Sequence, residues 1–270
     1  MGRVLILSSF VASSGVGGFA QSQVLSALGH EPVLAPTVLF GRHPGLGAPG
    51  GASVAAEVFE GVLEGIERQG GFGRFDFLVT GYFASPAQAT AAVRVIDAAR
   101  ASGGARVLVD PVMGDAGKGL YVRPEVAEVI KGDLAPRADL LTPNLWELGF
   151  LTGGESLDVE AAVRAARDFS GRVAMTSAAA GPDRIGVLAL DDEARLYSHA
   201  AATSAPNGTG DLFAALLVGA LLDGHAFYDS VRRATGGVAD AVRAASGELP
   251  LTAMSARWRA PQSEVAETTL

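Results

Sequence analysis

The residues best suited to chemistry form the segment Asn207-Gly208-Thr209-Gly210-Asp211. It directly precedes an apolar run that predicts a helix over residues 211–222. Closely spaced glycines let backbone N–H groups point outward at a helix N-terminus, where they and the helix dipole attract a phosphate. A carboxylate in the first turn, here Asp211, can accept a proton from a hydroxyl that attacks this phosphate. The segment alone also fits a glycine turn whose aspartate merely complements the dipole.

Two more carboxylates follow the apolar run at residues 107–109. The segment Asp110-Pro111-Val112-Met113-Gly114-Asp115 places Asp110 at the end of a predicted strand, which stops at Pro111 because proline cannot donate to the strand ladder. Oxygen ligands beside a phosphate suit Mg²⁺ or its bound waters. A solvated turn built on Asp and Gly is the alternative interpretation.

A third segment, Thr142-Pro143-Asn144 followed by Glu147, combines polar side chains with a signal for the start of a helix. A Thr cap, a Pro at the first helical position and a Glu in the first turn commonly begin helices. Taken alone, this segment indicates local structure rather than chemistry.

Strand-like apolar runs alternate with helical stretches along most of the chain. The expected strands span residues 4–7, 32–40, 75–80, 106–110, 140–142 and 173–176, with an antiparallel hairpin at 185–190 and 195–198. The expected helices span residues 17–28, 53–68, 85–101, 124–130, 144–151, 159–169, 211–222 and 227–245. This alternation predicts an α/β fold with three layers (α/β/α), in which helices flank a mainly parallel sheet. Ligands bind beyond the carboxyl ends of such strands, where the polar segments lie.

For the loop at residues 41–51, the C-terminus and three histidines, the sequence predicts where they lie in the fold. Residues 41–51 (GRHPGLGAPGG) are the richest in Gly and Pro and predict a surface loop that could cover the substrate. The last ten or so residues are polar and are expected to fray. His30, His199 and His225 stand at the ends of expected elements and are expected on the surface.

Composition excludes several classes of function. The chain has 270 residues, is 49% hydrophobic and 19% charged, and carries a net charge of −8 without a basic block. A nucleic-acid partner or an anionic membrane is disfavoured, because both call for a basic patch. The lack of cysteine excludes disulfides, thiolate metal sites and cysteine nucleophiles. No signal peptide or membrane-spanning stretch is evident, so a cytoplasmic protein is expected.

The three segments occur in a fixed order, DPVMGD, TPN-x-x-E and GTGD, each after a predicted strand or before a predicted helix. Thr80-Gly81-Tyr82, the stretch from Thr37 to His43 and Thr176-Ser177 accompany them. In these residues the chain resembles the pyridoxal kinase branch of the ribokinase-like superfamily, over nearly its whole length. The resemblance implies a single ribokinase-like kinase domain over residues 1–270.

The resemblance also implies a role for each matching residue. Asp211 would be the catalytic base, with Gly208, Thr209 and Gly210 forming the anion hole. The residues that would contact ATP are Asp110, Thr142, Asn144, Glu147, Thr176, Ser177 and Thr209. Those that would arrange Mg²⁺, largely through water, are Asp110, Asp115 and Glu147. Those that would contact the vitamin are Ser9, Val11, His43, Tyr82 and Asp211, with Tyr121 on a flap over the site.

The activity that the resemblance implies is ATP-dependent phosphorylation of the 5'-hydroxymethyl group of pyridoxal, with pyridoxine and pyridoxamine as further substrates. The implied assembly is a homodimer, and a monovalent cation requirement stays open. The run Ser13-Ser14-Gly15-Val16-Gly17-Gly18 resembles instead the related hydroxymethylpyrimidine kinases of thiamine biosynthesis, although those usually carry Cys where Asp211 stands. A non-catalytic vitamin- or nucleotide-binding module is the third alternative, and an intact GTGD segment argues against it.

Overall fold

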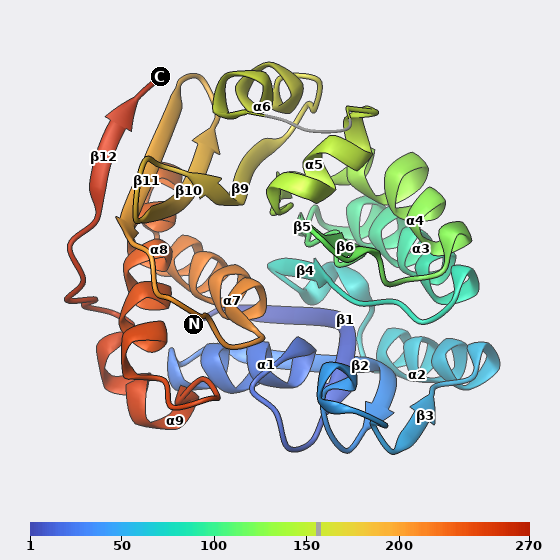
Figure 1. The fold of residues 1–270 in the computed structure, drawn as a ribbon. Helices are drawn as coiled ribbons and strands as arrows, with labels where there is room; N and C mark the ends of the chain where they lie inside the picture. The colour runs from blue at the N-terminus through green and yellow to red at the C-terminus, as the bar shows by residue number, and fades with distance from the viewer. Residues whose placement is uncertain (155–157) are drawn as a thin grey trace.

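The computed structural model describes residues 1–154 and 158–270, and a ten-stranded sheet forms its centre (Figure 1). The strands of this sheet, in spatial order, are β12 (Ala266–Thr269), β11 (Ala194–Ala200), β10 (Arg184–Leu190), β9 (Arg172–Ala179), β8 (Leu140–Leu141), β5 (Arg106–Val109), β4 (Phe77–Thr80), β1 (Arg3–Val11), β2 (Glu31–Phe40) and β3 (Gly51–Ser53). The six strands from β9 to β2 are parallel, and antiparallel strands flank them at both edges. A separate hairpin pairs β6 (Gly114–Asp115) with β7 (Gly119–Leu120).

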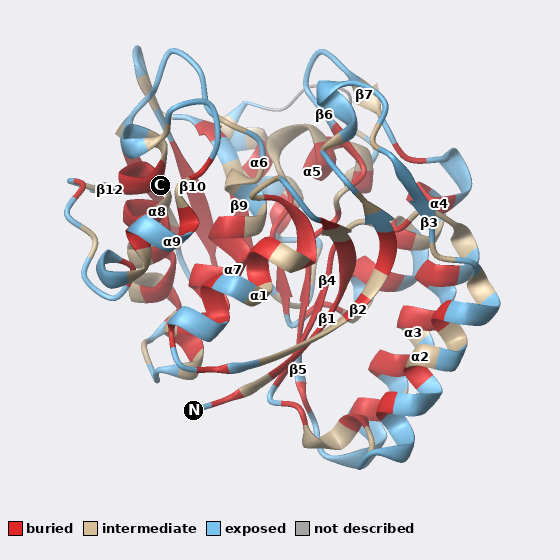
Figure 2. Cartoon of the chain, turned by 90° about the horizontal axis from the view of Figure 1, so that it is seen from below, coloured by how far each residue is buried: buried red, intermediate tan, exposed pale blue. Residues whose placement is uncertain are grey.

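Helices cover both faces of the sheet, as the predicted three-layer fold requires. They are α1 (Gly17–Ala27), α2 (Ala56–Arg68), α3 (Pro86–Ser102), α4 (Pro124–Val129), α5 (Leu145–Thr152), α6 (Val159–Ala166), α7 (Thr209–Leu222), α8 (Phe227–Ala244) and α9 (Leu251–Met254). Figure 2 separates the two outer layers, with α1, α7, α8 and α9 on one side of the sheet and α2, α3 and α4 on the other.

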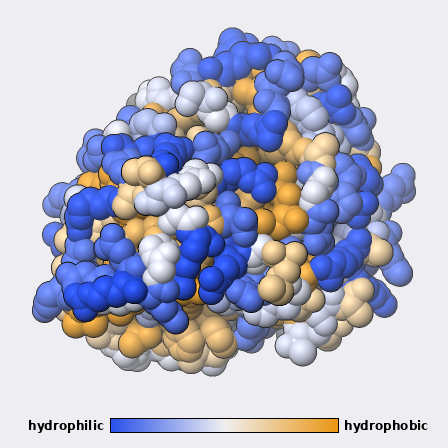
Figure 3. All heavy atoms as spheres, turned by 180° about the vertical axis from the view of Figure 1, so that it is seen from behind, coloured by the Kyte–Doolittle hydropathy of each residue, from blue (hydrophilic) through white to orange (hydrophobic). Residues whose placement is uncertain are grey.

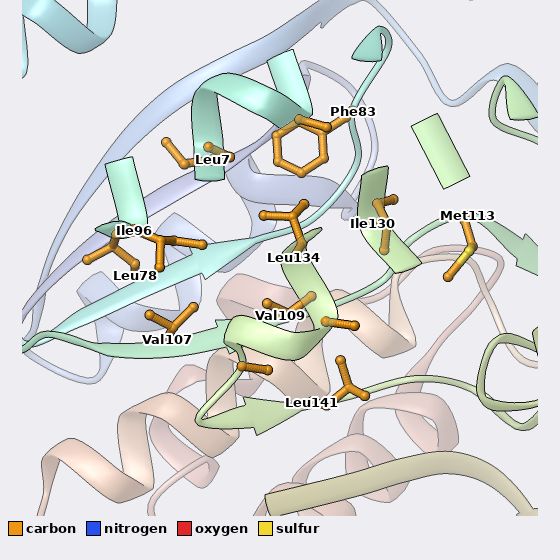
Figure 4. Close-up of a cluster of buried hydrophobic side chains, with 14 of the residues drawn as sticks. Leu7, Leu78, Phe83, Ile96, Val107, Val109, Met113, Ile130, Leu134 and Leu141 are labelled. Atoms are coloured by element: carbon orange, nitrogen blue, oxygen red, sulfur yellow. The ribbon is translucent and has the colours of Figure 1, made fainter. Parts of the chain in front are cut away.

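Strand periodicity explains the two layers. Successive strand side chains point to opposite faces, so Leu5 and Leu7 pack with α2 to α6, whereas Val4 and Ile6 pack with α1, α7 and α8. The central strands β4, β5 and β8 follow the same rule. Figure 4 shows part of the first cluster, in which Leu7, Leu78, Val107 and similar strand residues meet side chains of α3 and the neighbouring segments. Burial on both faces is why the sequence shows continuous apolar runs here.

The structure corrects several predicted boundaries. Strand β1 runs to Val11, so Ser9 lies inside it, at a point where the register between β1 and β2 shifts. The expected helix at residues 53–68 begins only at Ala56, because Ser53 ends β3. The prediction that the C-terminus frays is wrong, since β12 pairs with β11.

His30 also departs from its predicted place on the surface. It is 5% exposed, and its Nδ1 accepts a hydrogen bond of 3.2 Å from the Gly2 N–H. Burial lowers the pKa of its imidazole.

Hydrophilic residues cover most of the face seen in Figure 3, and apolar residues appear between them in smaller groups. Among the described residues, none of the helices has the length and apolar character needed to cross a bilayer.

Candidate active site

The glycine segment before α7 is held in a conformation that only glycine adopts easily. Gly208 has φ +93°, and a Cβ there would lie 2.1 Å from the Gly15 carbonyl oxygen. The Leu212 N–H donates to the Gly208 carbonyl at 2.9 Å, so the N–H groups of the preceding residues have no acceptor within the helix. A Cβ on Gly210 would meet no atom within 4 Å. The N-terminus of α7 therefore offers N–H donors next to open space.

Asp211 stands in the first turn of α7 and is partly exposed. Burial raises the pKa of its carboxyl to about 6, and a hydrogen bond with the backbone of Gly17 acts in the opposite direction. A general base works best when its pKa lies near the pH at which the enzyme acts. It is then largely deprotonated and still basic enough to take a proton.

Asp110 lies just beyond β5, between the ends of two neighbouring strands. Its N–H donates to the Thr80 carbonyl at 3.2 Å, and the Thr142 N–H donates to Val109 at 3.0 Å on the other side. Burial, and then the negative charges of Glu147 and Asp211, raise the pKa of Asp110 well above its usual range. The Thr142 hydroxyl acts in the opposite direction. The charges of the Asp110 and Asp211 carboxylates are thus close enough to affect each other.

Glu147 holds the start of α5 and the β6 segment together. Its Oε2 accepts from the Asn144 N–H at 2.8 Å, while the Asn144 side chain accepts from the Glu147 N–H at 2.9 Å, which completes a capping box. Its Oε1 accepts from the N–H groups of Met113 at 3.0 Å and Gly114 at 3.4 Å. Burial raises the pKa of Glu147 to about 7. The predicted role of Glu147 as a cap partner is confirmed, but the predicted Thr cap with Pro at the first helical position is wrong. Asn144 is the cap and α5 begins at Leu145, because the Asn144 side chain accepts from the Glu147 N–H.

The β6–β7 hairpin rises from this base. The Asn144 side-chain amide donates to the Gly114 carbonyl at 2.9 Å, and a Cβ on Gly114 would lie 2.0 Å from the Trp146 ring. Asp115 is exposed, and Tyr121, just beyond β7, is 48% exposed. Burial, and then the field of Glu147, Asp110, Asp211 and Asp115, raise the pKa of the Tyr121 phenol. The base of the hairpin therefore lies beside Glu147 and Asn144.

Thr176 and Ser177 lie in β9, which continues past the predicted end. The Thr176 N–H donates to the Pro143 carbonyl at 2.8 Å, so this residue lies beside the start of α5. The pairing of β9 with β10 is irregular here, and Ser177 adopts φ +60°. A bulge of this kind redirects side chains and is common next to functional sites.

Three of the residues expected to face the vitamin lie in or beside β1 and β2. A Cβ on Gly17 would lie 2.0 Å from the Ser9 Oγ, so Ser9 is next to the residue that bonds Asp211. The His43 ring lies 3.5 Å from the Asn207 side chain, and burial lowers the pKa of His43. Val11 is 2% exposed and pairs with Phe40 in β2.

Tyr82 follows β4 and is held from both sides. Its N–H donates to the Ser8 Oγ at 3.3 Å, and its carbonyl accepts from the Thr37 hydroxyl at 2.7 Å. Burial raises the pKa of its phenol.

Two residues that act on the site were not given a role from the sequence. The backbone of Gly17 forms a hydrogen bond with Asp211, and burial and the positive charge of Lys118 lower the pKa of His43. The Gly-rich run before α1 was a signal for Gly17, because closely spaced glycines also precede Asp211. Nothing in the sequence distinguishes Lys118.

The donor set fits a magnesium ion that keeps most of its waters. Among the described residues, no three His, Cys, Asp or Glu side chains come close enough to hold a metal by themselves. Mg²⁺ commonly binds through one or two carboxylates, several waters and substrate phosphates. Both oxygens of Glu147 accept backbone hydrogen bonds, so Asp110 and Asp115 would be the carboxylates left to hold such an ion or its waters. The Thr80 hydroxyl is buried without a hydrogen-bond partner in the described residues and could bind one of its waters.

Comparison with known proteins shows the family of the chain. The sequence model of the family described as Phosphomethylpyrimidine kinase matches residues 75–251. The Pyridoxine/pyridoxal/pyridoxamine kinase of Bordetella bronchiseptica is 35% identical over 92% of both chains. The Pyridoxal kinase PdxY of Leifsonia xyli is 34% identical over 79% of both. The chain belongs to the pyridoxal kinase family.

Solved structures extend this result to the fold. The pyridoxal kinase of Entamoeba histolytica matches with a TM-score of 0.93 over 100% of both chains, at 24% identity. The pyridoxal kinase of Leishmania donovani in complex with ADP and pyridoxamine matches with a TM-score of 0.90 over 100% of both chains, at 26% identity. The predicted family and the ribokinase-like α/β/α fold are confirmed.

Proposed function

We propose that this protein phosphorylates the 5'-hydroxymethyl group of pyridoxal, and of pyridoxine and pyridoxamine, with ATP as the phosphoryl donor. The observation that carries the proposal is the partly exposed Asp211 carboxyl, with its raised pKa, beside N–H donors at the start of α7. The Bordetella bronchiseptica relative, named as a kinase of all three vitamers, supports the substrate class. The related structure with ADP and pyridoxamine supports both substrates of the reaction.

In the proposed mechanism, Asp211 takes the proton of the substrate hydroxyl. The resulting oxygen attacks the γ-phosphorus, and the bond from this phosphorus to the β,γ-bridging oxygen breaks, which releases ADP and the phosphorylated vitamer. The N–H groups of Gly208, Thr209 and Gly210 bind the transferring phosphoryl oxygens. Phosphoryl transfer depends mostly on such positioning and charge stabilisation.

The nucleotide and the ion would occupy the neighbouring edge of the sheet. Thr142, Asn144, Thr176 and Ser177 would contact the nucleotide. Asp110 and Asp115 would hold Mg²⁺, largely through its waters, while Glu147 fixes the backbone between them. When bound, the ion would bridge phosphate oxygens and neutralise part of their charge.

The proposed vitamin pocket combines a hydroxyl from Ser9, an imidazole from His43 and a phenol from Tyr82, with Val11 beneath it and Tyr121 above. These groups match the phenolic oxygen, ring nitrogen and flat face of a pyridine vitamer. Hydroxymethylpyrimidine would leave part of this polar set unpaired, and each unpaired buried group costs about 1–3 kcal/mol. Hydroxymethylpyrimidine kinase stays the second candidate, because the matching family model is described by a phosphomethylpyrimidine.

The deciding experiment measures ATP consumption by the purified protein with each compound in turn. A higher kcat/KM for pyridoxal than for hydroxymethylpyrimidine is the expected result. The reverse order would overturn the vitamin B6 assignment and leave the role of Asp211 standing. The variant Tyr82→Ala should raise the KM for pyridoxal more than the KM for ATP.

We also propose that residues 1–270 form one kinase domain and that two copies associate as a homodimer. The support is the resemblance that covers nearly the whole chain. Light scattering on the purified protein tests the assembly, and a monomeric mass would refute it.

A further inference from the structure

Gln88, on α3, is a buried glutamine whose side chain connects three segments that are far apart in the sequence. It is 1% exposed. Its Nε2 donates to the Thr37 carbonyl at 2.9 Å and to the Val54 carbonyl at 2.7 Å. Its Oε1 accepts from the Ala84 N–H at 2.9 Å. The side chain therefore joins strand β2, the segment before α2 and the segment between β4 and α3.

These three contacts require an amide. One nitrogen donates both of its N–H groups to carbonyl oxygens of different segments, while the amide oxygen accepts a backbone N–H. A carboxylate of the same shape would offer only acceptors to the two carbonyl oxygens. An apolar side chain of similar size would make none of the three bonds. The surroundings of Gln88 thus account for a polar residue inside the helix layer.

The contacts of Gln88 continue through Thr37 to Tyr82. Thr37 is buried, and its hydroxyl donates to the Tyr82 carbonyl at 2.7 Å. The Tyr82 N–H donates to the Oγ of Ser8, which is also buried, at 3.3 Å. Both backbone groups of Tyr82 are therefore bonded to side chains of β1 and β2, while Gln88 fixes Ala84 two residues further on.

Packing restricts the residues on either side of Tyr82. A Cβ on Gly81 would lie 2.4 Å from the Ser8 Oγ. Phe83 is 1% exposed and lies in the apolar cluster of Figure 4. Tyr82 itself is only partly buried. Because its side chain has few torsions and each prefers a small number of angles, a fixed backbone limits where the phenol can lie.

We propose that Gln88 and Thr37 are positioning residues, whose hydrogen bonds hold Tyr82 where its phenol contacts the bound vitamer. This inference rests on the proposed function, which places Tyr82 in the vitamin pocket. A side chain that is already held in place loses little conformational freedom on binding, so its contact contributes more to affinity. Loss of either positioning residue should weaken vitamer binding and leave the chemical step at Asp211 unchanged.

The first test compares Gln88→Met with Ser85→Ala, a control in the same turn of α3. We expect Gln88→Met to raise the KM for pyridoxal about 5–30-fold, as expected when buried hydrogen bonds are lost. Its KM for ATP and its kcat should change less than about twofold. The Ser85 Oγ caps α3 by accepting the Gln88 N–H at 3.4 Å. Ser85→Ala should therefore lower the Tm but leave the KM for pyridoxal unchanged, since the side-chain bonds of Gln88 remain.

The second test asks whether Thr37 acts through its hydroxyl. Thr37→Val keeps the shape of the side chain and removes the donor to the Tyr82 carbonyl, so it should raise the KM for pyridoxal about 3–10-fold. Thr37→Ser keeps the hydroxyl and should stay within about twofold of the wild type. Equal losses in the two variants would overturn the proposal, because packing rather than the hydrogen bond would then be the cause.

A combined variant tests whether both residues act through Tyr82. In a Tyr82→Ala background, Gln88→Met should raise the KM for pyridoxal less than about twofold, because the phenol that it positions is already absent. The same increase in both backgrounds would overturn the proposal, as would a KM within about twofold of wild type for Gln88→Met alone. If Gln88→Met does not fold, Thr37→Val with Tyr82→Ala makes the same comparison. A wild-type protein with no activity on any vitamer would instead refute the proposed function.

Discussion

Two glycine-containing segments at the carboxyl edge of the sheet differ in what determines their backbone. In the segment before α7, Gly208 is required by a neighbour, since a Cβ would lie 2.1 Å from the Gly15 carbonyl oxygen. In the β6–β7 hairpin, Gly117 and Gly119 have similar positive φ angles but no neighbour within 4 Å of a Cβ. The first segment is fixed by tertiary contacts, whereas the second is fixed only by its own turn.

This difference matches what each segment carries. The first presents Asp211 and the N–H donors, which must keep their positions within a fraction of an ångström for phosphoryl transfer. The second presents Asp115 and Tyr121, both of which are exposed. Close packing therefore surrounds the glycine of the first segment, whereas the glycines of the second are open to solvent.

The largest expected effect comes from removing the base on the rigid segment. Asp211→Asn should lower kcat about 10²–10⁴-fold, because the amide cannot accept the proton of the hydroxyl. Affinity for ADP, measured by calorimetry, should stay the same, since the backbone donors remain. A variant that keeps more than a tenth of the wild-type rate would remove Asp211 from this role.

The next prediction contrasts Gly208, whose replacement should lower stability, with Gly210, whose replacement should lower activity. Gly208→Ala should lower the free energy of unfolding by about 1–3 kcal/mol. Its methyl group would collide with the Gly15 carbonyl oxygen, and alanine rarely adopts the positive φ of this position. Gly210→Ala should leave this free energy unchanged, yet lower kcat more than tenfold as its methyl group enters the space for the phosphoryl oxygens. Urea unfolding and steady-state kinetics measure the two quantities. Full activity of Gly210→Ala would mean that no phosphoryl group docks there.

A smaller effect concerns the pH dependence of stability. The pKa of Asp211 is about 6 in the folded protein, above its usual value, so the folded state binds this proton more tightly than the unfolded state does. The contribution to stability is therefore complete at pH values below the unfolded pKa and is lost as the pH rises through about 6.

Asp211→Asn removes this loss. The variant should be more stable than the wild type at pH 8, by an amount on the order of 1–3 kcal/mol, and similar to it at pH 4. Urea unfolding at the two pH values measures the difference. Asp115→Asn, on the exposed hairpin, is the control and should change neither value. A wild type as stable as Asp211→Asn at pH 8 would contradict the prediction.

The smallest effect is expected in the hairpin tip. Gly117→Ala meets no neighbour and should change the free energy of unfolding by less than about 1 kcal/mol, with the cost of its positive φ confined to the turn. We expect kcat to fall less than threefold. A loss as large as that of Gly208→Ala would show that tertiary contacts also hold the hairpin, and the contrast between the segments would disappear.

The sequence by itself determined the order of the elements and the superfamily, and it indicated the residues of the candidate site. Helix starts, turn glycines and the two-residue periodicity of strands are local signals. They were enough to predict the glycine segment Asn207 to Asp211 and the helix start that contains Asn144 and Glu147. The rule that ligands bind beyond the carboxyl ends of parallel strands then placed Asp110, Thr142 and Tyr82 at one edge.

Tertiary structure decided the features that depend on residues far apart in the chain. The burial of His30 depends on Gly2, the pairing of the polar residues 266–269 depends on β11, and the turn at Ser177 depends on an irregular pairing with β10. The shift of the Asp110 pKa depends on Glu147 and Asp211, which are 37 and 101 positions away in the sequence. Electrostatic fields and strand pairing act through space, so no local pattern records them.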